Sequence, residues 1–262
     1  MESPAFLEQS LQSVFGQTLR ADEVVLVEDG PLTPELYDVV SRFQAEYPEL
    51  KVIPLEKNGG LGRALNEGLN YCSHDLVVRA DTDDISKPNR FELQVEYMSQ
   101  HPEIDVCGAS IDEFVDDTNH VTSTRLLPEE HKKLYHFGKR RNPINHPVVI
   151  FRKAAVESAG GYRHFSLFED YYLWARMMMN GAKFHNLKDS LLFFRYSPQM
   201  IKRRGGWKYA GVEMKFQFAL WRMGYINLPT MIENIMIRFS VRIIPNSLRG
   251  WVYSNLLRNK KC

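Results

Sequence analysis

The chain has 262 residues, of which 44% are hydrophobic and 25% charged, a composition typical of a soluble globular protein. The net charge of +1 gives no overall field that would favour nucleic acid as a partner. The three cysteines are widely spaced, so we expect neither a disulfide framework nor a thiolate metal site. With no secretory signal pattern and no apolar run of membrane-spanning length, the sequence predicts a cytoplasmic protein with one domain at 1–206 and a helical extension at 207–262.

The first 80 residues alternate between helical and strand patterns. A helix is predicted from Ser3-Pro4, and strands are predicted at 23–28, 51–55 and 76–80, with helical segments between them. This alternation predicts right-handed crossovers and a mainly parallel sheet flanked by helices. Ligands of such sheets bind at the carboxyl ends of the strands.

Three carboxylates, Asp81, Asp83 and Asp84, follow the strand 76–80 directly. Side chains alternate along an extended chain, so Asp81 and Asp83 are expected to point to the same side. Carboxylate oxygens at the end of a buried strand suit Mg²⁺ or Mn²⁺. An acidic turn that caps the next helix at 86–88 would fit the same residues.

Two other strands also end in polar turns, at Asp29-Gly30 and at Asn58-Gly59-Gly60. Each could be a tight turn that uses glycine for a positive φ. The glycine pair could also offer backbone N–H groups to phosphate oxygens. Because three polar strand ends should converge on one edge of the sheet, we favour the metal interpretation of the acidic cluster.

The second half of the chain is expected to contain a helix from Pro88, a strand at 104–109, a hairpin or loop at 112–128 and a helix at 129–138. His146, ahead of a strand at 148–151, is either a hydrogen-bonded loop histidine or an acceptor contact. Glu169 and Asp170 open a further helix, where acids are commonly partners of the helix dipole.

Taken in order, these motifs resemble the family 2 glycosyltransferases, which bind nucleotide sugars on a GT-A fold. The resemblance runs from about Phe6 to Arg195 and rests on Gln17-Thr18, Val27-Glu28-Asp29-Gly30, Asn58-Gly59-Gly60-Leu61 with Asn66, Asp81-Thr82-Asp83-Asp84, and Glu169-Asp170-Tyr171 with Leu173-Trp174. Phrases at 26–32, 60–66 and 202–206 are similar to bacterial enzymes that assemble capsular or exopolysaccharide repeat units.

The resemblance implies an inverting, metal-dependent transferase that moves a hexosyl group from a nucleotide-diphosphate sugar, with a UDP-sugar as the expected donor, to a glycan or lipid-linked acceptor. It assigns catalysis to Asp170 as the base with support from Glu169, and a Mn²⁺ or Mg²⁺ ion to Asp83 and Asp84. The implied nucleotide-binding residues are Asp29, Asn58, Gly59, Gly60, Arg63, Asp81 and Asp83. Candidate acceptor or diphosphate contacts are His146, Arg195, Arg203 and Arg204; the basic turn at 202–204 could equally be a solvated loop.

The sequence departs from the family pattern at its start, where Met1-Glu2-Ser3-Pro4 stands in place of a first strand. One alternative is therefore an N-terminally truncated, non-catalytic protein that binds nucleotide sugars or serves as a scaffold. A nucleotidyltransferase shares the sheet type, but the glycine-rich, lysine-containing loop expected of that class is not visible.

Residues 228–262 combine aromatic and aliphatic side chains with six basic residues and one acid. This segment is too charged to span a bilayer but is typical of an amphipathic helix in the headgroup region. The competing interpretation is a helix docked on the domain core. We favour peripheral contact with the inner face of the plasma membrane, where a lipid-linked acceptor would be presented.

Overall fold

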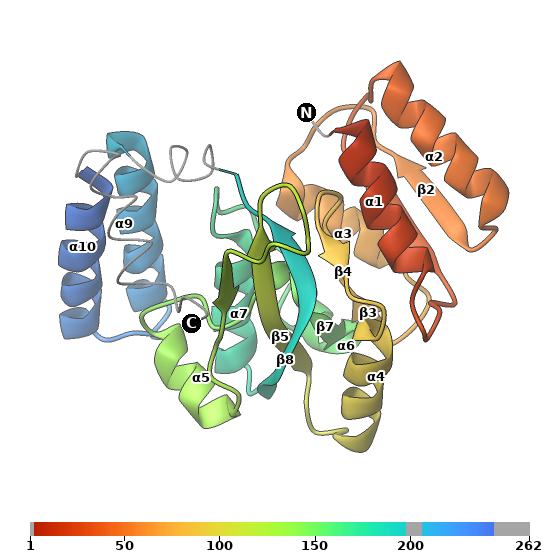
Figure 1. The fold of residues 1–262 in the computed structure, drawn as a ribbon. Helices are drawn as coiled ribbons and strands as arrows, with labels where there is room; N and C mark the ends of the chain where they lie inside the picture. The colour runs from red at the N-terminus through yellow and green to blue at the C-terminus, as the bar shows by residue number, and fades with distance from the viewer. Residues whose placement is uncertain (1–2, 198–205, 244–262) are drawn as a thin grey trace.

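Residues 3–197 and 206–243 are described by the computed structural model, and they form two β-sheets with helices packed around them (Figure 1). The amino-terminal region holds the smaller sheet, in which β1 and β2 pair in parallel. Its elements are α1 (Pro4–Phe15), β1 (Val24–Glu28), α2 (Pro34–Glu46), β2 (Leu50–Pro54) and α3 (Leu61–Tyr71). Apolar side chains of α1 and α2 recur at helical spacing and bury a small core between these helices and β2.

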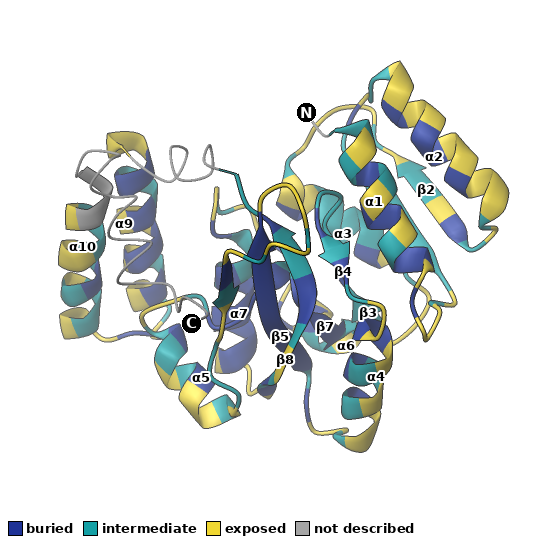
Figure 2. Ribbon diagram, viewed as in Figure 1, coloured by how far each residue is buried: buried dark blue, intermediate teal, exposed yellow. Residues whose placement is uncertain are grey.

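The larger sheet has six strands in the order β3-β7-β5-β8-β4, with β6 beside β5. Its strands are β3 (Leu76–Val78), β4 (Ile85–Ser86), β5 (Val106–Phe114), β6 (Ser123–Arg125), β7 (Ile150–Arg152) and β8 (Phe184–Arg195). β5 is buried along its whole length and forms the centre of this sheet (Figure 2).

Helices cover the larger sheet and supply most of its core. They are α4 (Arg90–Gln100), α5 (His131–Gly138), the 3₁₀ turn η1 (His146–Val148), α6 (Lys153–Ser158), α7 (Glu169–Met179), α9 (Trp207–Arg222) and α10 (Leu228–Ile243). Trp174 of α7 is fully buried beside Phe184 of β8, with ring centroids 6.0 Å apart. The α/β class predicted from the sequence is therefore what the chain adopts.

The expectation of a mainly parallel sheet is wrong in its strand directions. Only the β1–β2 and β5–β8 pairs are parallel, and the other four pairings are antiparallel. Strands and helices alternate regularly only up to β3; β4 follows after a short acidic turn, and β5 leads into the hairpin with β6. The short connection accounts for the antiparallel β5–β6 pair, because a parallel pair needs a longer crossover. The other antiparallel pairs join strands that are far apart in the chain, so their directions are not set by a local connection.

Three elements were not anticipated, namely the short β4, the helix α6 and the long β8. β8 contains an apolar run at 191–194, but its first half, Phe184-His185-Asn186-Leu187-Lys188, alternates only weakly. It lies beside the fully buried β5, so its position is set by tertiary pairing more than by its own pattern.

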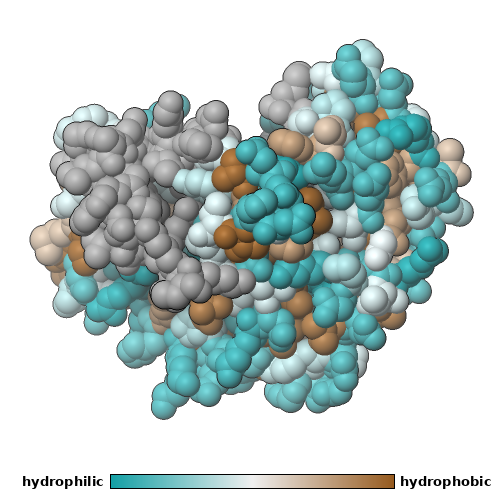
Figure 3. All heavy atoms as spheres, in the orientation of Figure 1, coloured by the Kyte–Doolittle hydropathy of each residue, from teal (hydrophilic) through white to brown (hydrophobic). Residues whose placement is uncertain are grey.

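The carboxyl-terminal helices α9 and α10 lie side by side at one end of the molecule (Figure 1). Phe216 of α9 belongs to the same buried cluster as Trp174 and stacks on Phe168 with ring centroids 4.5 Å apart. Hydrophobic side chains lie at the outer edge of the molecule over α10 (Figure 3). Across 3–197 and 206–243, no helix has both the length and the apolar character needed to cross a bilayer.

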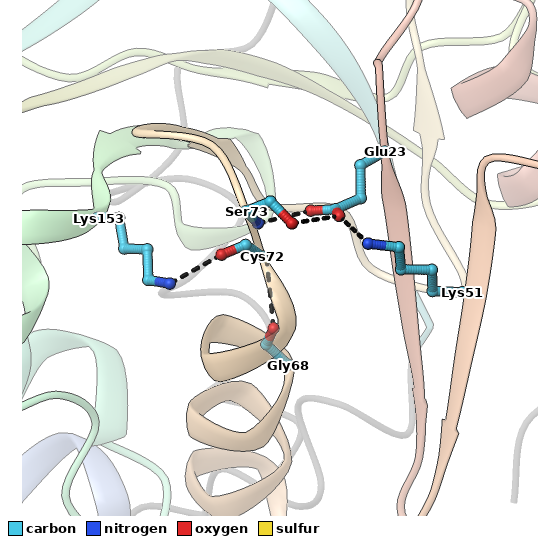
Figure 4. Close-up of polar contacts among 6 residues, drawn as sticks. All are labelled: Glu23, Lys51, Gly68, Cys72, Ser73 and Lys153. Atoms are coloured by element: carbon cyan, nitrogen blue, oxygen red, sulfur yellow. Dashed lines mark hydrogen bonds and ion pairs between the residues drawn. The ribbon is translucent and has the colours of Figure 1, made fainter.

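The two sheets are not joined by strand pairing within the described residues, where β1 pairs only with β2 and β3 only with β7. No strand precedes α1 there, in agreement with the departure noted at the start of the sequence. Glu23, at the entry to β1, instead accepts hydrogen bonds from the backbone N–H and hydroxyl of Ser73 at 2.8 and 2.9 Å and pairs with Lys51 (Figure 4). These bonds fasten the smaller sheet to the end of α3.

Candidate active site

The acidic cluster lies in the turn between β3 and β4. One carboxylate oxygen from each of Asp81, Asp83 and Asp84 lies within 4.8 Å of the others. Asp84 is 2% exposed, and its Oδ1 accepts the backbone N–H of Arg195 at 2.8 Å. Its buried Oδ2 has no hydrogen-bond partner among the residues that the structure describes. Burial, with the nearby Asp81 charge, raises the pKa of Asp84 to about 8.

This donor set fits a divalent cation. A buried carboxylate oxygen without a partner, next to two further carboxylates, is costly unless a positive charge compensates it. Hard carboxylate oxygens are the ligands that Mg²⁺ and Mn²⁺ prefer. The alternative in which the acidic turn caps the next helix is not seen, because α4 begins only at Arg90, its N-cap residue is Asn89, and Gln17 accepts the backbone N–H of Phe91 in its first turn.

Neighbouring elements hold the acidic turn in place. Ser10 of α1 donates its hydroxyl hydrogen bond to the carbonyl of Asp81 at 2.7 Å. Arg195 at the end of β8 donates through Nε to the carbonyl of Asp83 at 2.9 Å and through its guanidinium to Gln9 at 2.6 Å. Arg195 was predicted as a diphosphate or acceptor contact. It is 9% exposed and, through these hydrogen bonds, positions the acidic turn.

Asp29 closes a second polar turn. Its two carboxylate oxygens accept the backbone N–H groups of Gly59 and Gly60 at 2.7 and 3.0 Å, and Asn58 donates to its carbonyl at 3.1 Å. The structure therefore joins Asp29 and 58–60 as predicted, but the glycine N–H groups are bonded to Asp29 and are not open phosphate donors. The side chain of Arg63 lies against Gly59.

The pair Glu169 and Asp170 opens α7. Asp170 accepts a hydrogen bond from Asn142 at 2.6 Å, a contact that fixes the orientation of its carboxylate. Burial raises the pKa of both carboxyl groups, as expected for acids with limited access to water. A Cβ on Gly62 would lie 3.4 Å from Cγ of Glu169, so the first turn of α3 approaches this pair closely.

Arg79, which the sequence patterns did not single out, connects the two acidic groups. It is 7% exposed and forms an ion pair with Asp81, and two of its guanidinium nitrogens have no hydrogen-bond partner within the described part of the chain. The charges of both Asp81 and Asp170 act on it. A basic residue within the otherwise apolar run 76–80 was the sequence signal for this role.

His146 is buried behind this region. Its Nε2 lies 3.0 Å from the hydroxyl of Tyr162, and its ring packs edge-on against Trp174. Burial, with the nearby Arg79 charge, lowers its pKa well below the usual range, so the imidazole is neutral.

The Asn66 side chain accepts a hydrogen bond from the backbone N–H of Tyr162 at 2.8 Å and donates one to its carbonyl at 2.6 Å, which holds α3 to the segment before α7. Arg203 and Arg204 lie outside the described residues.

Comparison with other proteins identifies close relatives. A family model described as "Glycosyl transferase family 2" matches residues 1–159. The chain is 40% identical over 257 residues to the UDP-Gal:alpha-D-GlcNAc-diphosphoundecaprenol beta-1,3-galactosyltransferase of Escherichia coli, covering 98% of this chain and 93% of that protein. It is 42% identical over 255 residues to the amylovoran biosynthesis glycosyltransferase AmsE of Erwinia amylovora, covering 96% and 94%.

Solved structures share the fold. The mannosyltransferase PcManGT of Pyrobaculum calidifontis, solved with GDP-Man and Mn²⁺, has a TM-score of 0.65 at 15% identity and covers 95% of this chain and 69% of its own. TarS 1-349 of S. aureus, solved with UDP-GlcNAc, has a TM-score of 0.65 at 17% identity, with 95% and 76% covered. The GT-A-like fold predicted from the sequence is confirmed.

Proposed function

The chain belongs to glycosyltransferase family 2, and from this membership we propose that it transfers a hexosyl group, with inversion, from a nucleotide-diphosphate sugar to a glycan or lipid-linked acceptor in polysaccharide biosynthesis. A UDP-sugar is the proposed donor. The E. coli relative is named for a UDP-sugar donor and a diphosphoundecaprenol-linked acceptor, and TarS was solved with UDP-GlcNAc. The observation that carries the proposal is the cluster of Asp81, Asp83 and Asp84, in which a buried oxygen of Asp84 has no partner within 3–197 and 206–243.

The donor diphosphate is proposed to bind at this cluster. Asp83 and Asp84 would hold a Mn²⁺ or Mg²⁺ ion, which when bound neutralises charge on the departing diphosphate. Asp81, fixed by its ion pair with Arg79, would contact the ribose or diphosphate together with Asp83. Asp29, held rigidly by Gly59 and Gly60, would bind the base, and Arg63 would lie beside it.

Asp170 is proposed as the general base. Its carboxylate would take the proton of an acceptor hydroxyl as that oxygen attacks the anomeric carbon from the face opposite the leaving nucleoside diphosphate. Asn142 keeps the carboxylate oriented, and Glu169 supports it. A raised pKa makes Asp170 a stronger base than an exposed aspartate, which suits proton transfer near neutral pH.

A panel of nucleotide sugars, each with and without Mn²⁺, tests the donor and metal assignments. A ligand that binds only the folded state raises the melting temperature, and the rise grows with the logarithm of the ratio of ligand concentration to Kd. We expect one UDP-sugar to stabilise the protein in the presence of Mn²⁺, and Asp83→Asn and Asp84→Asn to lose that response. Asp38→Asn, an exposed aspartate on α2, is the control. No stabilisation by any donor would instead support a non-catalytic scaffold.

Peripheral contact with the inner face of the plasma membrane through residues 228–262 completes the proposal. α10 covers the first part of this range, and residues 244–262 lie outside the described structure. Contact at a membrane surface would bring the active site to a lipid-linked acceptor.

A further inference from the structure

The exposed side of α9 carries a column of large apolar side chains. Trp207, Met214, Phe218 and Trp221 are 73%, 37%, 49% and 36% exposed, and the rings of Phe218 and Trp221 lie 5.2 Å apart. With 3.6 residues per turn, these positions fall on one side of the helix. The opposite side, including Phe216 and Leu220, is buried in the core. The exposed apolar residues of α9 are therefore not part of the buried core of the domain.

A basic column borders the apolar one. Lys208, Lys215 and Arg222 are all exposed and recur every seven residues, close to two full turns of the helix. The acid on α9, Glu213, is 2% exposed and paired with Arg238. The exposed side of α9 therefore presents only positive charge next to aromatic rings.

The apolar surface continues onto α10. Leu228, Ile232 and Met236 are 47%, 47% and 61% exposed. Met214 of α9 and Phe239 of α10 line the same groove between the helices, and the rings of Trp207 and Phe239 lie 5.5 Å apart. The apolar column of α9 therefore meets α10 at Phe239. We use the name α9–α10 face for the exposed apolar residues of both helices together with the basic column of α9.

We propose that the α9–α10 face docks on the surface of a bilayer that contains anionic lipid. Tryptophan rings are favoured at the headgroup level, and each lysine or arginine near an anionic surface adds to the attraction. The proposal assigns the membrane contact to α9 as well as to 228–262. It rests on the proposed function only in one respect, namely that docking would bring the active site to a lipid-linked acceptor.

Charge complementarity favours a lipid surface over a second copy of the chain. A twofold contact would place this face against itself. The α9–α10 face offers little acid to match its basic column: Glu213 is buried, and Glu233 of α10 is bonded to Arg140 at 2.7 Å. An anionic headgroup layer supplies the missing negative charge.

Co-sedimentation of the full chain with vesicles tests this proposal without donor or acceptor. We expect binding to phosphatidylcholine vesicles that contain phosphatidylglycerol, and about tenfold or more weaker binding by Phe218→Ser/Trp221→Ser and by Lys208→Gln/Lys215→Gln/Arg222→Gln. The matched controls are Leu19→Ser/Leu126→Ser and Lys132→Gln/Lys133→Gln/Lys188→Gln. They change residues that are also exposed but lie outside α9 and α10, and they should bind like the parent protein. Unchanged melting temperatures establish that each variant is folded.

Three results would overturn the proposal. The first is that the parent protein does not bind anionic vesicles. The second is that both α9 variants bind as well as their controls, which would move the contact to residues 244–262. The third is that the α9 variants change only the oligomeric state measured by light scattering, which would identify a second copy of the chain as the partner. Failure of the proposed function is distinguishable, because it would abolish stabilisation by nucleotide sugars and leave vesicle binding intact.

Discussion

The two sheets of the molecule are stabilised in different ways. β5, in the larger sheet, is buried at all nine positions and pairs with β6, β7 and β8. β1, in the smaller sheet, is only partly buried along 24–27 and pairs with β2 alone among the described strands. The larger sheet is built around a desolvated strand, whereas the smaller sheet depends on helices and polar side chains for its attachment.

These attachments lie close to the proposed active site. Gln17, just after α1, donates to the carbonyl of Lys87 at 2.8 Å and accepts the backbone N–H of Phe91 at 3.0 Å. Asn66 of α3 holds the backbone of Tyr162. The smaller sheet would thus position the donor base through Asp29, while the chemistry would belong to the larger-sheet region. Substitutions on the two sides should therefore have different effects.

The largest effect is expected for Asp170→Asn, on the larger-sheet side. Loss of the base should lower kcat by roughly 10²–10⁴-fold, the usual contribution of general base catalysis. The melting temperature and donor binding should stay close to those of the parent, because the amide keeps the shape of the side chain. Steady-state transfer measures kcat, and thermal unfolding with and without donor measures stability and donor binding, with Asp38→Asn as the control. If Asp170→Asn kept full activity, Asp170 would not be the base.

Arg79→Met should lower transfer by roughly 10²-fold, the scale seen when one charge-stabilising donor is removed from an active site. Burial raises the pKa of Asp170, and the Arg79 charge opposes that rise. Without this charge the pKa should rise further, so the acid limb of the pH–rate profile should move to higher pH. Arg79→Lys should restore much of the parent profile. If the acid limb of the pH–rate profile of Arg79→Met stayed at the same pH as in the parent, the role of Arg79 would be structural only.

Glu23→Gln, on the smaller-sheet side, should reduce stability and leave kcat unchanged. Glu23 is a partly buried acceptor for Ser73 and Lys51, and loss of hydrogen bonds to a charged group costs about 1–3 kcal/mol. Urea unfolding at pH 7 measures the difference, and Glu56→Gln, an exposed glutamate just after β2, is the control. A large fall in kcat would instead make the small sheet part of the chemistry.

The pH dependence of the same variant sharpens this prediction. Burial raises the pKa of Glu23, but the hydrogen bonds from Lys51 and Ser73 outweigh it and lower the pKa from 4.5 to about 2. A carboxylate with a depressed folded-state pKa stabilises the protein above its unfolded pKa and loses that contribution as pH falls through the folded pKa. The stability difference between parent and Glu23→Gln should therefore be full above about pH 5 and shrink between 4.5 and 2.

Much of the smaller-sheet region was predictable from its sequence because its elements carry local signals. The helices with Pro4 and Pro34 in the first turn and the apolar strand before Asp29 lie where the patterns place them. The acidic cluster was also found, because its three carboxylates are adjacent in the chain.

The larger-sheet region was predicted less well because its features are non-local. β8 obtains its register from β5, and most antiparallel pairs of this sheet join strands that are far apart in the chain. Asn142 orients Asp170 across 28 residues, and Arg79 acts through charges on two different segments. No periodicity in the sequence encodes such contacts.

The smallest effect is expected at the junction itself, for Ser10→Ala. The Ser10 side chain is buried, and its hydroxyl binds the carbonyl of Asp81, so the change removes one hydrogen bond from a partly buried acceptor. The cost should be about 1 kcal/mol of unfolding free energy. Since that bond also braces the acidic turn, Mn²⁺-dependent stabilisation by the donor should weaken several-fold, a change that Ser99→Ala, with its hydroxyl bonded within α4, should not produce. Equal loss of stability in both variants would mean that α1 merely packs on the turn and does not hold it.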